Sequence, residues 1–192
     1  MKHLQILIAF LMLGFLSASL FAVSAPPDQP SYFSDVHGGA ALAWSMHKVG
    51  QFDKSYLAHR DAALRWTLKQ AKDAPQGGRT WVQNPSAPKN YPTFNVIMTP
   101  SADFIALTLL DIYRNTKDPK LLKAVKDHVT WLKNTAINRK TPYGTLNYWG
   151  AKQTMNSRQN NRQPRPLVSG HSHGLGNVLS TLSEYYAASK DE

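Results

Sequence analysis

Apolar residues recur at spacings of three and four along much of this chain, which is the pattern of an amphipathic helix. The clearest example covers 119–132, where one face carries lysines and the other carries Leu121, Leu122, Val125, Val129 and Leu132. Asp118 is a good N-cap for this helix, and Pro119 suits its first position. Comparable patterns predict further helices over 36–49, 54–71, 101–113 and 172–188.

An internal repeat organises these helices. Three residues recur 65 positions later in the same order, since Asp53, Leu57 and Trp66 are matched by Asp118, Leu122 and Trp131. Each copy holds a helix, a polar connector ending in Asp, and a second helix, so each copy is a helical hairpin whose Trp we expect to be buried. A single hairpin cannot bury its apolar surface, and such repeats are stable only when stacked. The sequence therefore predicts a single all-α domain of tandem hairpins over 25–192.

The helix over 172–188 opens as the first helix does, because His173-Gly174-Leu175-Gly176 resembles His37-Gly38-Gly39-Ala40. We expect it to be the first helix of a third hairpin, which gives about two and a half hairpins. That number cannot close a ring, so the array is predicted to be open and incomplete. Three forms of the protein fit this prediction: a truncated toroid, a piece whose self-association completes the helical array, or an open crescent on which the lone helix packs back.

The N-terminus has the pattern of a secretory signal peptide. Lys2 precedes an apolar run that reaches Val23, and the small residues Ala22 and Ser24 permit cleavage before Ala25. We therefore predict a signal peptide over 1–24 and export to the periplasm or beyond the cell, with an uncleaved membrane anchor as the alternative. The formal net charge is +10, or +9 without Lys2, which favours anionic partners but does not select among them. The sequence contains no Cys, which excludes disulfides and thiolate metal sites.

Two long linkers, 75–100 and 138–170, each contain a glycine followed a few residues later by a Trp. Loops of this length are usually functional or disordered. Because the helices of a hairpin are antiparallel, the linkers and the starts of the first, third and fifth helices must meet at one end of the array. We expect the functional site at that end.

These repeats resemble those of the α/α-toroid proteins, which include six-hairpin glycosidases, polysaccharide lyases and the lanthionine synthetase C-like family. The segment 109–119 fits their Tyr, polar connector and Asp, and 170–176 resembles the Gly-x-x-His-Gly opening of a lanthionine synthetase C-like repeat, although Asn177 replaces its final Gly. The resemblance covers about 33–190 and implies a proton-transfer role for His173 and an acidic role for Asp35. That family's cyclases bind zinc through two Cys and a His. Since this chain has no Cys, we do not expect a thioether cyclase.

The candidate catalytic residues are His173, Asp35 and Asp103, all close to helix starts at the linker end. A His at a helix start can be held neutral as an acid or base, and glycosidases use two carboxylates that face each other across a cleft. The simpler alternatives are that the His packs against a loop and that both Asp residues cap helices. We expect no cofactor and no metal, although His171 and His173 could bind zinc together with His37 or Asp35.

The candidate substrate-binding residues are His37, His171, Trp81, Trp149, Tyr148 and Arg79. Flat aromatic rings could stack on sugar faces and arginine could pair with uronate carboxylates, although the rings could equally cover the core. The sequence thus favours an exported α/α-toroid protein that binds or processes an acidic carbohydrate, as a glycoside hydrolase or polysaccharide lyase would. The alternative is a non-catalytic lanthionine synthetase C-like binding or assembly module. We expect an acidic glycan or another anionic surface as partner, and no specific nucleic acid.

Overall fold

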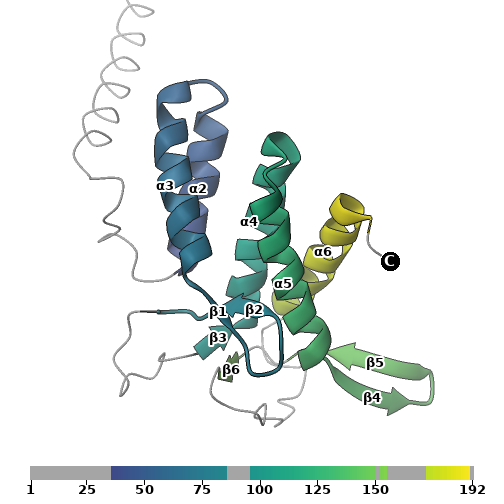
Figure 1. Cartoon of the computed structure of the whole chain (residues 1–192). Helices are drawn as coiled ribbons and strands as arrows, with labels where there is room; N and C mark the ends of the chain where they lie inside the picture. The colour runs from purple at the N-terminus through teal and green to yellow at the C-terminus, as the bar shows by residue number, and fades with distance from the viewer. Residues whose placement is uncertain (1–35, 86–95, 150–151, 155–171, 191–192) are drawn as a thin grey trace, which may run out of the picture. The chain divides into compact units, whose positions relative to one another are not determined.

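The computed structural model describes residues 36–85, 96–149, 152–154 and 172–190 (Figure 1). All of them belong to one compact unit, Ser31–Glu192. The predicted signal peptide and Asp35 lie outside the described residues. Within the described ranges, no helix has the length and apolar character needed to cross a membrane.

The described chain is mostly helical. Its helices are α2 (Val36–Val49), α3 (Leu57–Lys69), α4 (Thr99–Thr116), α5 (Pro119–Thr135) and α6 (Ser172–Ser189), and a 3-10 turn, η1 (Lys54–Tyr56), precedes α3. Short strands form three antiparallel pairs: β1 (Ala71–Asp73) with β2 (Arg79–Trp81), β3 (Val96–Met98) with β6 (Lys152–Thr154), and β4 (Ile137–Thr141) with β5 (Gly144–Tyr148). The helices were predicted and the strands were not, because strands of three to five residues are too short for a period-two pattern to stand out.

The predicted helical hairpins are confirmed, since α2 packs against α3 and α4 packs against α5. The first helices of the hairpins are neighbours, with α4 in contact with both α2 and α6. The lone helix α6 also packs against α5. The described helices thus form stacked hairpins and an additional helix, and they form no closed ring.

The two hairpins share their capping geometry. Asp53 accepts a hydrogen bond from the backbone N–H of Ser55 at 2.9 Å, and Asp118 accepts one from the backbone N–H of Lys120, also at 2.9 Å. Both the caps and their donors are 65 residues apart, so the repeat holds at the level of single hydrogen bonds. The bond from Lys120 satisfies a backbone N–H group in the first turn of α5, and the bond from Ser55 satisfies one in the 3-10 turn that precedes α3.

The repeat also extends into the linkers. The indole N–H of Trp81 donates to the carbonyl oxygen of Thr67 at 3.0 Å, and that of Trp149 donates to the carbonyl oxygen of Leu132 at 2.7 Å. Thr67 and Leu132 are again 65 residues apart. Each Gly-then-Trp segment therefore returns to the second helix of its own hairpin and fastens its Trp there.

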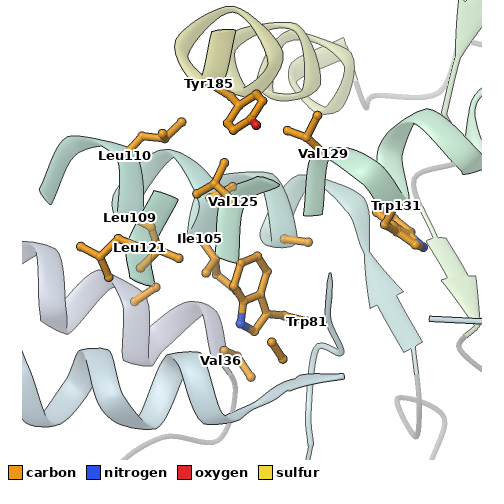
Figure 2. Close-up of a cluster of buried hydrophobic side chains, with 14 of the residues drawn as sticks. Val36, Trp81, Ile105, Leu109, Leu110, Leu121, Val125, Val129, Trp131 and Tyr185 are labelled. Atoms are coloured by element: carbon orange, nitrogen blue, oxygen red, sulfur yellow. The ribbon is translucent and has the colours of Figure 1, made fainter. Parts of the chain in front are cut away.

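The core lies between the helices of the second hairpin and their neighbours, and Figure 2 shows side chains of α4, α5 and α6 meeting around Tyr185. Trp131 is fully buried in this core, as predicted. Trp66 is only partly buried, so the expectation of equal burial is wrong for this residue. The reason is the position of its helix: α3 packs mainly on α2, where Trp66 lies against Gly39, whereas α5 is covered by α4, α6 and β2.

The helix starts and the linkers meet at one end, as the topology predicted. The backbone N–H of Val36 at the start of α2 donates to the carbonyl oxygen of Gln83 in the first linker at 3.3 Å. Strand β3 of that linker pairs with β6 of the second. Near the start of α6, the side-chain amide of Asn177 donates to the carbonyl oxygen of Pro100 in the first turn of α4 at 3.4 Å.

Candidate functional site

A buried polar network connects three elements near the linker end. His128 Nε2 lies 3.1 Å from Asp103 Oδ1, and His128 Nδ1 lies 3.0 Å from the hydroxyl oxygen of Thr80. All three residues are completely buried. Because a carboxylate oxygen only accepts hydrogen bonds, Nε2 of His128 donates to Asp103 and Nδ1 is left to interact with the Thr80 hydroxyl.

Packing fixes the imidazole of His128 within this network. The ring of Trp131 stacks on it with centroids 5.4 Å apart and planes inclined by 22°, and the ring of Trp81 lies 5.5 Å away. The hydroxyl of Thr181 in α6 approaches the backbone oxygen of Asp103 at 3.4 Å. The network thus joins α4, α5, α6 and β2.

The order Thr, His, Asp resembles a nucleophile, a base and an orienting acid. No substrate can reach it in this arrangement, since the Thr80 side chain is completely buried. Its burial favours a structural role for Asp103, whose second carboxylate oxygen has no hydrogen-bond partner among the described residues. The capping interpretation of Asp103 is wrong, because the N-cap of α4 is Met98 and Asp103 lies inside the helix.

A groove of about 300 Å³ lies on the surface formed by α2, α4 and α6. Its lining is mainly apolar, with charged groups towards one end: Trp44, Phe104, Leu107, Thr108, Leu110, Asp111, Arg114 and Glu184. Trp44 is 41% exposed, and the ammonium of Lys48 lies over its ring, 5.6 Å from the centroid. The groove extends towards the last turn of α4 and therefore away from the linker end, where the site was expected.

The charges of the groove are paired with one another. Asp111 Oδ2 accepts from the indole N–H of Trp44 at 2.8 Å and from Lys48 Nζ at 2.7 Å. Burial alone would raise the pKa of Asp111, but the hydrogen bonds from Lys48 and Trp44 outweigh it and lower that pKa. Arg114 forms an ion pair with Glu184. The positive charges of Lys48 and Arg114 balance the negative charges of Asp111 and Glu184, so the groove and its ion-pair partners carry no net charge.

A buried histidine lies beside this groove. The side-chain amide of Asn115 donates to His47 Nε2 at 3.2 Å, which requires the unprotonated nitrogen on that side of the ring. Burial, together with the charges of Arg60 and Lys48, lowers the pKa of His47 against the opposing effect of Asp111. The ring is therefore held in its neutral form.

Of the residues predicted to bind substrate, His37 lies nearest the groove. Its exposed ring meets that of Phe104 edge-on, with centroids 4.4 Å apart. Arg79 is engaged within its own strand pair, where it contacts Asp73 at 2.9 Å and donates to the carbonyl oxygen of Ala71 at 2.8 Å. The guanidinium is still half-exposed, so an anion could approach it.

Two of the aromatic rings predicted to bind substrate, Trp81 and Trp149, lie among the described residues. Trp81 is only 2% exposed and Trp149 is partly buried against the core. Their burial agrees with the alternative that these rings cover the core. Asp35 and His171 lie outside the described residues, as do the side chains of His173 in α6 and Tyr148 in β5.

Within the described ranges, no three His, Asp or Glu side chains are placed to hold a metal ion. Of the residues considered for zinc, Asp35, His171 and the side chain of His173 lie outside the described residues. Comparison with protein-family models, with curated proteins and with solved structures finds no significant match to this chain.

Sequence reasoning singled out Asp103 of the buried network, but it missed His128 and Thr80 and the residues of the groove. His128 could have been noticed, because it interrupts the apolar stripe of α5 between Val125 and Val129. Trp44 and Asp111 carry no such signal, since they are 67 residues apart and belong to different hairpins. Only the packing of α2 against α4 brings them together.

Proposed function

We propose that this protein is an exported α/α-toroid-type protein that binds an acidic carbohydrate, and that the sugar chain lies in the groove between α2, α4 and α6. The observation that carries the proposal is the ring of Trp44, which is 41% exposed at the edge of a mainly apolar groove. The C–H face of a sugar packs well on a flat ring of this kind. Asp111 holds the indole in place, so little freedom is lost on binding.

The toroid relationship is supported by the repeat itself. The two hairpins share their caps and the hydrogen bonds of Trp81 and Trp149, as successive units of a solenoid or ring do. The acidic nature of the ligand is supported by the net charge of +10, which raises the local concentration of polyanions.

The groove favours binding over hydrolysis. A glycosidase needs one protonated and one ionised carboxyl group on either side of the sugar bond. Asp111 is bound by Lys48 and Trp44 with its pKa lowered, and Glu184 is ion-paired with Arg114, so the groove offers no evident proton donor. This reasoning gives preference to the non-catalytic form of the proposal.

The test is calorimetric titration with oligogalacturonate and with neutral dextran. We expect oligogalacturonate to bind, Trp44→Ala to weaken binding about tenfold, and Trp44→Phe, which keeps a flat ring, to weaken it less. No binding of oligogalacturonate, or equal binding by wild type and Trp44→Ala, would overturn the proposal. Release of reducing ends or unsaturated products during the titration would show that the protein is an enzyme instead.

A further inference from the structure

The two hairpins differ in the strand pair that follows each second helix. After α3, the β1–β2 pair is short, and β2 packs on α5 with Thr80 and Trp81 buried. After α5, the β4–β5 pair forms an arm, residues 137–148, which packs against no other described helix or strand to a comparable extent (Figure 1). A two-stranded hairpin without a packed layer gains little stability. Core formation therefore explains the first pair, whereas the arm has no comparable packing role among the described residues.

The tip of the arm holds an aromatic ring in solvent. Tyr143 is 100% exposed, and its backbone N–H donates to the hydroxyl of Thr141 at 3.2 Å. The same hydroxyl donates to the carbonyl oxygen of Gly144 at 2.8 Å, while Pro142 restricts the turn and Gly144 provides a φ of +123°. The turn is thus locally fixed, and it presents the Tyr143 ring at a defined place.

One face of the arm is entirely polar. Asn138 lies opposite Asn147 and Lys140 lies opposite Thr145, so their four side chains share one face, and all four are exposed. No acidic residue occurs within 137–148, which contains the cations Arg139 and Lys140. The arm therefore combines amides, a hydroxyl, positive charge and, at its tip, the flat ring of Tyr143.

We propose that this arm is a second contact site for the acidic polysaccharide, with Tyr143 stacking on a sugar ring and Lys140 paired with a uronate carboxylate. The inference rests on the proposed function and gives it the charge selectivity that the neutral groove lacks. Amides and hydroxyls match sugar hydroxyls, whereas insertion into a membrane would need a larger apolar tip than a single Tyr. A nucleic-acid strand would be held by several stacking rings along a basic channel, whereas the tip of the arm presents the single ring of Tyr143.

The experiment compares two double variants of the full chain. Tyr143→Ala/Lys140→Ala removes the ring and the cation of the arm, and Phe52→Ala/Lys120→Ala removes an exposed ring and an exposed cation elsewhere; Phe52 is 92% exposed. Binding of oligogalacturonate is measured by calorimetry at low and at physiological salt. The melting temperature should be unchanged in both variants, because neither removes a buried side chain.

The arm variant should bind about tenfold more weakly and show a smaller salt dependence, while the matched control binds as wild type does. If wild type binds and the arm variant binds equally well, the inference is wrong and the proposed function stands. If wild type does not bind at all, the proposed function fails together with the inference. Equal or stronger arm-dependent binding to phosphatidylglycerol vesicles or to single-stranded DNA would overturn the assignment of the arm to a glycan.

Discussion

Replacing His128 by Leu tests the buried network most directly. The change removes the hydrogen bonds at 3.1 Å to Asp103 and at 3.0 Å to Thr80, and it leaves the carboxylate of Asp103 completely buried with no partner among the described residues. A buried carboxylate left without its hydrogen-bond partner costs more than the about 1 to 3 kcal/mol of an unsatisfied neutral group. A domain of this size has only about 5 to 15 kcal/mol of stability.

The complementary change, Asp103→Ala, should cost less. It leaves an imidazole N–H unpaired, and an unsatisfied buried donor of this kind costs about 1 to 3 kcal/mol. The double variant His128→Leu/Asp103→Ala leaves neither the carboxylate nor the imidazole without its partner, so its cost should fall below the sum of the single costs by about 1 to 3 kcal/mol. The lost ring contacts with Trp81 and Trp131 are the same in both backgrounds and cancel in this comparison.

The assay is urea denaturation of the four proteins, followed by circular dichroism and by Trp fluorescence. Equal slopes with denaturant concentration would show that the variants unfold from comparable native states. A cost of less than about 1 kcal/mol for His128→Leu would refute the reasoning, because it would mean that water reaches the carboxylate of Asp103. Strict additivity of the single costs would refute it as well, since uncoupled residues do not form a network.

Three further predictions follow from burial and backbone geometry. Trp131→Ala should lower the free energy of unfolding by about 3 to 5 kcal/mol and the partly buried Trp66→Ala by clearly less, as measured by urea denaturation; equal costs would contradict their different burial. Gly78→Ala should destabilise by about 2 to 4 kcal/mol in the same assay, since the φ of Gly78 is +75° and a Cβ there would lie 2.5 Å from a backbone oxygen of α5. Gly144→Ala should cost less, because no atom lies within 4 Å of a Cβ at that position. The pKa of His47 is lowered in the folded protein, so the unfolded chain takes up a proton first as the pH falls. The contribution of His47 to stability is therefore complete above about pH 6.5 and is lost as the pH falls through the lowered pKa. Thermal melts from pH 7.5 to 5 should show a shallower decline for His47→Gln, and identical slopes would exclude this role.

Much of the helical fold could be read from local sequence. The start of α5 was predicted from Asp118 and Pro119, because capping depends on side chains within a few residues of the helix start. The register of the two hairpins was predicted from a repeat of 65 residues, which the caps and the Trp81 and Trp149 hydrogen bonds follow. The strands could not be read in this way, because β3 and β6 are each three residues long and pair across more than fifty residues of chain.

The sequence by itself determined where α2, α5 and α6 begin and that the helices pair as hairpins, because these properties depend on neighbouring residues and on a repeated apolar stripe. The tertiary structure alone decided the candidate site. Whether Trp66 is as buried as Trp131 depends on which elements cover each helix, and the two positions are equivalent in the repeat. The contact between Trp44 and Asp111 likewise depends on the angle and register at which α2 meets α4, which are set by packing over the whole interface and not by either segment alone.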